Sequence, residues 1–318
     1  MSKNVVFSQP WGGLGDNIQY SNLPRLYNSI GKNFYISRFN FVRSKEVEEL
    51  CWSSNEFVKS GKKIIPTIGY KVGIENNFKL LDEKFSTIQN VNKLHGFDPG
   101  DGYPELQIKK TDFVTAKKYD VVIDINGFSL FNHTTISYDK NSFREVISKY
   151  SSKNTFELSY PNLYKEKLFK NEHKKLEVKN LYHLIQILLQ TDKFVCVNSG
   201  AHTLAATLKN ISGSPKEIIS FNSVSDPDIE IVNGSINEKA GGFYFDNVFY
   251  EYIDVINNPT PDNNLNHKRD TRGVADQMQK SIFIHQFIFN PIPMTRDLII
   301  QNAPKIYHNI RKSLNIEK

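Results

Sequence analysis

The sequence predicts an α/β protein with two parallel sheets covered by helices. Three observations favour this fold class. Strand and helix signals alternate through most of the chain. Two units of strand, glycine turn and helix lie far apart, near residues 12 and 199. Residues 119–125 form a nearly continuous β-branched run, which is typical of a strand buried on both faces of a parallel sheet.

The elements follow from apolar periodicity and from capping signals. Strands are expected at residues 4–8, 33–37, 119–125, 193–197 and 216–221. Helices are expected from the first glycine turn to residue 27, and at 45–52, 76–89, 142–149, 181–189 and 201–209. From residue 279 onward the chain reads as helical, with interruptions at Pro291 and Pro293. Alternating elements of this kind build parallel sheets with helical crossovers.

We expect three parts along the chain. Residues 1–140 form an N-terminal Rossmann-like domain and residues 141–275 a C-terminal Rossmann-like domain. Residues 276–318 form a helical tail that packs back on the N-terminal domain. Ligands of open α/β sheets bind outside the carboxyl ends of the strands, and both glycine turns stand at such ends. The sequence therefore predicts a central cleft between the two domains.

Composition limits the class of protein and of partner. The chain has 318 residues, of which 39% are hydrophobic, and this is enough for a substantial core. A net charge of +6 with a pI near 9.0 favours anionic partners, such as nucleotides, phosphosugars, anionic membranes or nucleic acid. Cys51 and Cys196 are too few and too far apart for a disulfide framework or a zinc site, which indicates a reducing compartment. With no export signal and no membrane span in the sequence, we expect a cytoplasmic protein.

The first motif is the turn that contains Gly12, Gly13, Gly15 and Asp16. Glycines let the backbone turn sharply and leave its N–H groups uncovered. The helix that starts there offers unpaired amides and the positive end of its dipole. Asp16, at the mouth of this helix, fits two roles: a capping carboxylate and a general base.

The second motif runs from Asn198 to Ala206. Ser199, the backbone of Gly200 and Ala201, and the amides of the first helical turn form a seat that suits a pyrophosphate. His202 would add a donor, or a positive charge if it is protonated. The alternative is an ordinary helix start, with Ser199 as the N-cap and His202 on the surface.

Taken together, the two motifs resemble the heptosyltransferase family of inverting glycosyltransferases. The family's Gly-(Leu/Met)-Gly-Asp turn and following Leu-Pro correspond to Gly13–Asp16 and to Leu23-Pro24. Its Ser/Thr-Gly-x-x-His-Leu-Ala-Ala segment corresponds to residues 199–206. The similarity spans roughly residues 4–222. It implies a GT-B-like fold, with an N-terminal acceptor domain and a C-terminal nucleotide-sugar domain.

The resemblance implies that Asp16 removes the proton of the acceptor hydroxyl. The residues expected at the acceptor are Gly13, Gly15, Asn17 and Gln19. The residues expected at the donor are Ser199, Gly200, Ala201, His202, Thr203, Asn222 and Ser223.

The sequence departs from the family pattern at two points. The family's histidine falls at Thr203, whereas the histidine of this chain is one residue earlier, a rotation of about 100° on a helix. Either His202 or the hydroxyl of Thr203 is then the phosphate contact. No basic residue matches the one that the family sets against the leaving phosphate.

The predicted reaction is transfer of a sugar from a nucleoside diphosphate sugar to an acceptor hydroxyl, with inversion and without a metal or other cofactor. The resemblance points to a surface glycan, glycolipid or lipopolysaccharide intermediate as the acceptor, with a peripheral contact at the inner face of a membrane. Asp226-Pro-Asp228 resembles a metal-binding Asp-x-Asp motif, but it follows a strand of the wrong half and we interpret it as a loop.

Three alternatives stay open. The acceptor is a modified base in DNA, the chain binds a nucleotide sugar without catalysis, or the chain is a Rossmann-type oxidoreductase. The oxidoreductase needs an acidic residue after the second strand, where Arg38 and Asn40 stand instead.

Overall fold

The computed structural model describes residues 3–10, 12–61, 66–69, 85–108, 116–124, 147–160, 173–223, 230–232, 235–237 and 244–253. The first elements are β1 (Asn4–Ser8), α1 (Leu14–Ile18), α2 (Leu23–Ser29), β2 (Asn33–Ile36), α3 (Lys45–Glu48), the π-helix η1 (Glu49–Ser53), β3 (Ile68–Gly69) and α4 (Thr87–Leu94). Next come β4 (Tyr119–Asp124), β5 (Thr155–Ser159), β6 (Lys174–Glu177), α6 (Leu181–Leu189), β7 (Thr191–Val197), α7 (Gly200–Ser212) and β8 (Glu217–Ser223). The last are β9 (Glu230–Val232), β10 (Ser235–Asn237) and β11 (Phe249–Ile253).

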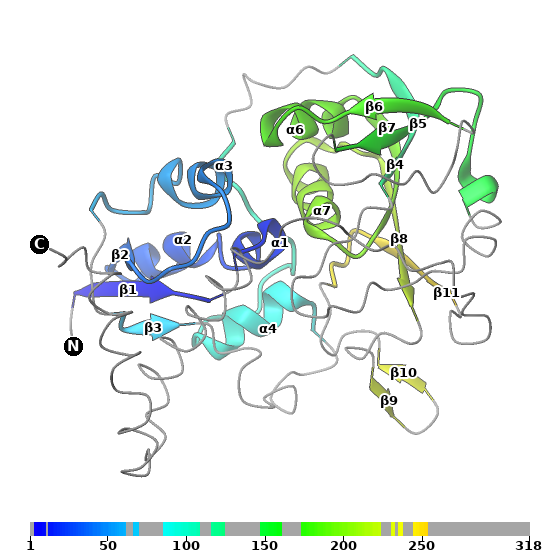
Figure 1. Ribbon diagram of the computed structural model, residues 1–318. Coiled ribbons are helices and arrows are strands. Elements are labelled where there is room, and N and C mark those ends of the chain that lie inside the picture. The colour runs from blue at the N-terminus through cyan, green and yellow to red at the C-terminus, as the bar shows by residue number, and fades with distance from the viewer. Residues whose placement is uncertain are drawn as a thin grey trace, which may run out of the picture.

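Two parallel sheets organise the molecule, as the sequence predicts. The smaller sheet has the order β2-β1-β3, and both pairings are parallel. The larger sheet has the order β11-β8-β7-β4-β5-β6, again with parallel pairings throughout. Strands β9 and β10 form a separate antiparallel pair (Figure 1).

Strand β4 belongs to the larger sheet. Its residues pair with β5 on one side and with β7 on the other, so that Ile123 lies opposite Val195. The first strand of the larger sheet therefore starts at residue 119. The sequence suggests a boundary between the two domains later in the chain, at residue 140. The expected tail, 276–318, lies outside the described residues.

The order in which strands are added to the larger sheet reverses between β4 and β7. From β4 the chain adds β5 and β6 on one side, and then returns to add β7, β8 and β11 on the other. Read from β6 to β11, this is the 3-2-1-4-5-6 order of the doubly wound Rossmann fold. Ligands of such sheets bind at the carboxyl ends of the strands, beside the reversal. In this chain that position is the end of β4 and the turn from β7 into α7.

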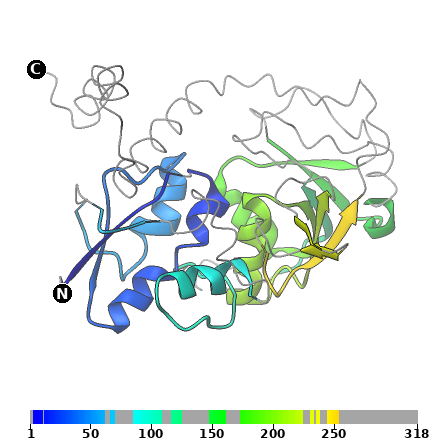
Figure 2. The ribbon, with the colours of Figure 1, turned by 90° about the horizontal axis from the view of Figure 1, so that it is seen from below.

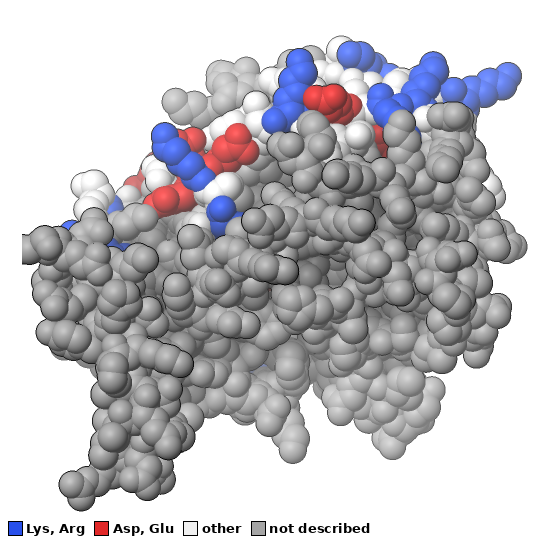
Figure 3. Space-filling view, in the orientation of Figure 1, with Lys and Arg blue, Asp and Glu red and all other residues white. Residues whose placement is uncertain are grey.

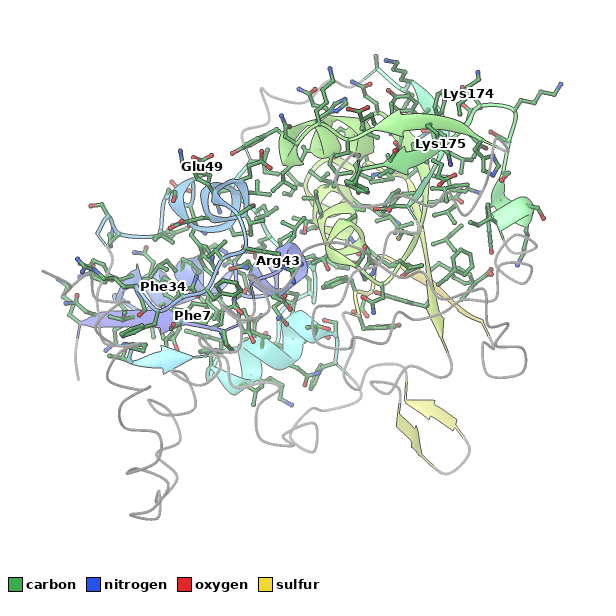
Figure 4. All side chains as sticks on the ribbon, in the orientation of Figure 1. Phe7, Phe34, Arg43, Glu49, Lys174 and Lys175 are labelled. Carbon is green, nitrogen blue, oxygen red and sulfur yellow. The ribbon has the colours of Figure 1, made fainter. Side chains whose placement is uncertain are left out.

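The hydrophobic core is continuous across the two sheets. One buried cluster contains Phe7 and Phe34 from the small sheet together with Phe194 and Leu204 from the large sheet and α7. The rings of Phe7 and Phe34 stack with their centroids 5.9 Å apart, and Figure 4 shows both in the small sheet. A second, smaller cluster contains Val195, Ile219 and Phe221. A shared core fixes the position of one sheet relative to the other.

Helices α1 and α7 lie between the two sheets. The two helices contact each other, and both Figure 1 and Figure 2 show them side by side. Other contacts join the halves on either side of this pair. Glu46 Oε2 accepts a hydrogen bond of 3.1 Å from Leu181 N, and Thr87 N donates a bond of 3.1 Å to Tyr244 O.

The prediction of a single helix from the glycine turn to residue 27 is wrong. The segment forms two helices, α1 and α2, joined by a turn at residues 19–22. Pro24 stands in the first turn of α2. Proline has no N–H, and its ring clashes with the carbonyl four residues earlier, so it disfavours a continuous helix here and is tolerated in the first turn of a new one.

Most other predicted elements are confirmed, with shifts of a few residues at their ends. The helix expected at 45–52 begins after Ser44, whose hydroxyl accepts a bond from Val47 N, and it continues as η1. Residues 70–84, which hold most of the helix expected at 76–89, lie outside the described residues, and α4 begins at Thr87. The sequence analysis missed β3, β5, β6, β9, β10 and β11.

Candidate functional site

The turn between β1 and α1 is closed by Asp16. Its Oδ2 accepts a hydrogen bond of 2.9 Å from Gly13 N, so the carboxylate caps the helix that carries it. A Cβ on Gly13 would lie 2.4 Å from the same Oδ2, so a side chain there would displace the capping carboxylate. Asp16 Oδ1 accepts no hydrogen bond from any described residue. One carboxylate oxygen is therefore structural, and the other is without a hydrogen bond to the described residues.

The side chain of Asp16 is partly buried, and burial raises the pKa of its carboxyl group above the ordinary value of an aspartate. The positive charge of Arg43 and the bond from Gly13 N lower the pKa and oppose this shift. A carboxylate with a raised pKa accepts a proton more readily than a fully solvated one. This is the direction required of a general base.

The two glycine turns contact each other directly. A Cβ on Gly200, at the start of α7, would lie 2.9 Å from Leu14 Cβ and 3.3 Å from Gly15 N. Only glycine lets the two helix starts approach so closely. Asp16 follows Gly15, so the carboxylate belongs to the residue next to the contact. The two motifs, far apart in the sequence, thus meet in the fold.

Asn17, expected at the acceptor, is fully buried and bonded inside the protein. Its Oδ1 accepts bonds from Gln9 Nε2 at 3.0 Å and from Trp52 Nε1 at 2.9 Å. Its Nδ2 donates a bond of 2.7 Å to Gly13 O. The side chain therefore holds the glycine turn, and we leave it out of the proposed acceptor site.

Gln19 is also buried, and its Nε2 donates a bond of 3.3 Å to Asp16 O. The bond links the side chain to the backbone of the residue that carries the carboxylate. Gly13 and Gly15 lie on either side of Leu14 at the contact with α7. An acceptor role of these three residues stays a prediction.

The start of α7 has the geometry expected of an anion seat. Ser199 Oγ accepts a bond of 3.4 Å from His202 N, and Ser199 O accepts one of 3.2 Å from Thr203 N. Gly200 and Ala201 are the first two residues of the helix, where backbone N–H groups have no acceptor inside the helix. Ser199 and Gly200 are partly exposed. The motif therefore stands where the strand order of the large sheet reverses. The free backbone N–H groups of the first helical turn point away from the body of the helix.

The side chains of His202 and Thr203 are not exposed at this seat. Both are fully buried, with 0% of their surface exposed. His202 Nε2 hydrogen-bonds Tyr250 Oη at 3.0 Å, and Thr203 Oγ1 donates a bond of 3.3 Å to Ser199 O. Burial lowers the pKa of His202 to about 3, so the imidazole is neutral at physiological pH. The surface position considered for His202 is wrong, because the first turn of α7 packs against β11 and the chain before it. A neutral imidazole also lacks the positive charge that a protonated one would add.

Asn222 and Ser223 are the last residues of β8, at the carboxyl edge of the large sheet. Their side chains lie outside the described part of the structure. Residues 226–228, with the Asp-Pro-Asp sequence, also lie outside it. Contacts of these residues with a nucleoside stay a prediction.

Arg43 is a candidate residue that the sequence analysis missed. It lies in the segment after β2, and its N donates a bond of 2.9 Å to Gly12 O. Figure 4 shows its side chain beside α1, and its charge acts on Asp16. A signal was present, because β1 and β2 are parallel and the segments after their carboxyl ends lie at the same edge.

Several other properties of the described residues bear on function. No group of three or more His, Cys, Asp or Glu among them could hold a metal ion, and no described helix is long and apolar enough to cross a membrane. Cys51 and Cys196 are free and buried. On the described part of the face in Figure 3, basic and acidic side chains lie next to one another. The positive net charge is therefore not gathered into a single patch on that part of the face.

The similarities of this chain to known proteins are structural. No family model and no curated protein matches it. Among solved structures it is similar to TibC, an iron-containing dodecameric glycosyltransferase of enterotoxigenic E. coli, with 13% identity and a TM-score of 0.48 over 96% of this chain and 76% of that one. It is similar to a family 9 glycosyl transferase of Veillonella parvula (10%, 0.43, 79% and 86%) and to the E. coli ADP-heptose lipopolysaccharide heptosyltransferase II (11%, 0.41, 90% and 100%). These are enzymes of the class that the two motifs resemble.

Proposed function

We propose that this protein is a glycosyltransferase that moves a sugar from a nucleoside diphosphate sugar to an acceptor hydroxyl, with inversion at the anomeric carbon. The observation that carries the proposal is the contact of Gly200 with Leu14 and Gly15. The contact places Gly15, the residue before Asp16, against the first turn of α7. Helix α7 begins where the strand order of the large sheet reverses.

The donor diphosphate is assigned to the start of α7. Doubly wound sheets bind ligands beside the reversal of strand order, and the turn from β7 into α7 stands there. The N–H groups of Gly200 and Ala201 and the positive end of the helix dipole favour a negative group. Preorganised donors of this kind stabilise the charge that grows on the departing diphosphate.

The acceptor hydroxyl is assigned to Asp16. Its Oδ2 is held by Gly13 N, which fixes the carboxylate, while Oδ1 accepts no hydrogen bond from a described residue. Oδ1 takes the proton as the hydroxyl oxygen bonds to the anomeric carbon and the diphosphate leaves from the opposite side. This single displacement inverts the configuration. A positioned base typically contributes about 10²- to 10⁴-fold to the rate.

A donor-binding panel tests the proposed phosphate seat. Thermal unfolding is followed with ADP-, GDP- and UDP-sugars, with ADP-heptose included because one of the similar structures is an ADP-heptose enzyme. We expect at least one donor to raise the melting temperature, since a ligand of the native state stabilises it by mass action. Stabilisation by a nicotinamide dinucleotide and by no nucleotide sugar would favour an oxidoreductase instead.

Ser199→Asp is the matched variant for this panel. Aspartate caps a helix as well as serine does, so the fold is retained, while its carboxylate repels a diphosphate at the same place. We expect loss of the donor-induced shift. Ser44→Asp makes the same change at the exposed N-cap of α3 and leaves the shift intact. An undiminished shift in Ser199→Asp would contradict the assignment.

The acceptor is proposed to be a surface glycan or a lipopolysaccharide intermediate. The protein is proposed to act in the cytoplasm, either in solution or bound peripherally to the inner face of a membrane.

Two rival functions predict different results in the transfer assay. A nucleotide-sugar-binding protein without catalysis binds the donor and releases no nucleoside diphosphate with any acceptor. A transferase for a modified base in DNA transfers the label to DNA and not to a glycan or glycolipid.

A further inference from the structure

Backbone hydrogen bonds join the segment after β2 to the end of β1 and to the glycine turn that follows it. Ser37 N, just after β2, donates to Phe7 O of β1 at 2.8 Å, and beyond both strands Phe41 N donates to Gln9 O at 3.0 Å. The last bond of the series runs from Arg43 N to Gly12 O at 2.9 Å. The backbone of Arg43 is therefore fixed relative to the turn that carries Asp16.

Gly12 and Gly13 make room for this arrangement. A Cβ on Gly12 would lie 2.5 Å from Phe41 Cε1 and 3.1 Å from Arg43 N, so a side chain there would push the segment away. A Cβ on Gly13 would lie 2.4 Å from Asp16 Oδ2 and 3.7 Å from Arg43 Nη2. The carboxylate and the guanidinium thus lie against the same small residue, on the same side of its backbone.

Among the described charged groups, Arg43 is the cation whose charge acts on Asp16. Helix α1 carries no other ionisable side chain. From α7, Lys209 Nζ bonds to Asn247 O, and the neutral His202 bonds to Tyr250. From η1, which bonds to α1 through Trp52, Glu49 lies 3.3 Å from Lys45.

We propose that Arg43 is a positioning residue for the base of the proposed transfer, and that its charge keeps Asp16 ionised while its backbone holds the glycine turn in place. The inference rests on the proposed function, because Asp16 is the base only in that reaction. Arg43 acts on the substrate through Asp16. No contact of Arg43 with donor or acceptor is required.

The direction of the effect follows from opposing influences on Asp16. Burial raises the pKa of the carboxyl group, and the charge of Arg43 lowers it. Without the guanidinium, less opposes the effect of burial, so the pKa of the Asp16 carboxyl group rises further. The base is then protonated, and inactive, over a wider range of acidic pH.

Arg43→Met is the decisive variant, because it removes the charge and keeps much of the side-chain volume. We expect the acid limb of the kcat profile to move to higher pH, with a loss of about fivefold or more on that limb, since even in bulk water a unit charge about 4 Å away has an effect of this size. At alkaline pH the loss disappears, and the KM for the donor is unchanged throughout. Arg43→Lys, which restores a charge, recovers most of the activity. Arg38→Met removes an exposed charge from the same segment and leaves the profile unchanged.

A readout without turnover separates this inference from the proposed function. The pKa of Asp16 is measured by carbon NMR of the carboxyl group in the wild type and in Arg43→Met, with Asp16→Asn for assignment. An increase in the variant supports the inference, and equal pKa values overturn it even if the wild type is an active transferase. If the pKa increases but no nucleotide sugar is turned over, the coupling of Arg43 to Asp16 stands and the proposed function fails.

Discussion

Gly200 lies against Leu14 so closely that a Cβ on the glycine would be 2.9 Å from the leucine Cβ. Real Cβ atoms do not approach other atoms to this distance, so any side chain at residue 200 would displace α1 or α7. This contact joins the two motifs on which the proposed function depends.

Gly200→Ala is expected to destabilise the protein by about 1–3 kcal/mol, the usual cost of an added methyl group in a packed interior. Urea unfolding measures the loss. In a Leu14→Gly background the same substitution should cost less, because the leucine Cβ is absent, and a double-mutant cycle gives the coupling. Equal costs in the two backgrounds would show that the helices do not meet at these residues.

Asn17→Ala should destabilise the fold by about 1–3 kcal/mol for each of the two buried donors, Gln9 Nε2 and Trp52 Nε1, that lose their acceptor. Unfolding followed by tryptophan fluorescence measures the change, since Trp52 is one of only two tryptophans. Asn28→Ala, on a partly exposed position of α2, is the control and should change stability by no more than about 0.5 kcal/mol. A small effect at Asn17 would mean that its bonds do not hold the turn.

The buried His202 makes stability depend on pH. Its pKa is lowered to about 3 in the folded protein, below the value of about 6.5 in the unfolded chain. The neutral imidazole therefore stabilises the fold above pH 6.5, and this stabilisation falls by about 1.4 kcal/mol per pH unit as the pH drops toward 3.

His202→Gln removes the titrating group. The free energies of unfolding of wild type and variant, measured between pH 7 and pH 5, should converge as the pH falls. His183→Gln, at a partly exposed position, is the matched control and should follow the wild type. A constant difference between wild type and His202→Gln at all pH values would contradict a buried neutral imidazole.

The two cysteines should be inert in the native protein. Cys51 and Cys196 are buried, with 1% and 0% of their surface exposed, and burial raises the pKa of both thiols. Ellman's reagent reacts with exposed thiolates, so we expect no reaction until guanidinium unfolds the chain, and two thiols after that. Rapid reaction of one thiol in the native state would place that cysteine at the surface.

The sequence predicts strands well where burial dictates their composition. Strands β1, β4 and β7 are apolar runs because both faces of a parallel sheet are covered. Strand β6, with the sequence Lys-Lys-Leu-Glu, is an edge strand and has no such pattern. Only its pairing with β5 makes it a strand, and local propensity cannot reveal a pairing.

The candidate site divides in a similar way. Gly13, Asp16, Ser199 and Gly200 are predictable, because helix starts and close backbone approach demand particular residue types. The burial of His202 depends on packing around Tyr250, which lies 48 residues later in the sequence. Tertiary contacts of this kind leave no local signal.

The most direct measurement is the rate of nucleoside diphosphate release by wild type and Asp16→Asn, with the donor that binds best and a glycan or glycolipid acceptor fraction. We predict acceptor-dependent release by the wild type, a loss of about 10²- to 10⁴-fold in kcat for Asp16→Asn, and unchanged donor affinity. Full turnover by Asp16→Asn would contradict the assignment of Asp16 as the base.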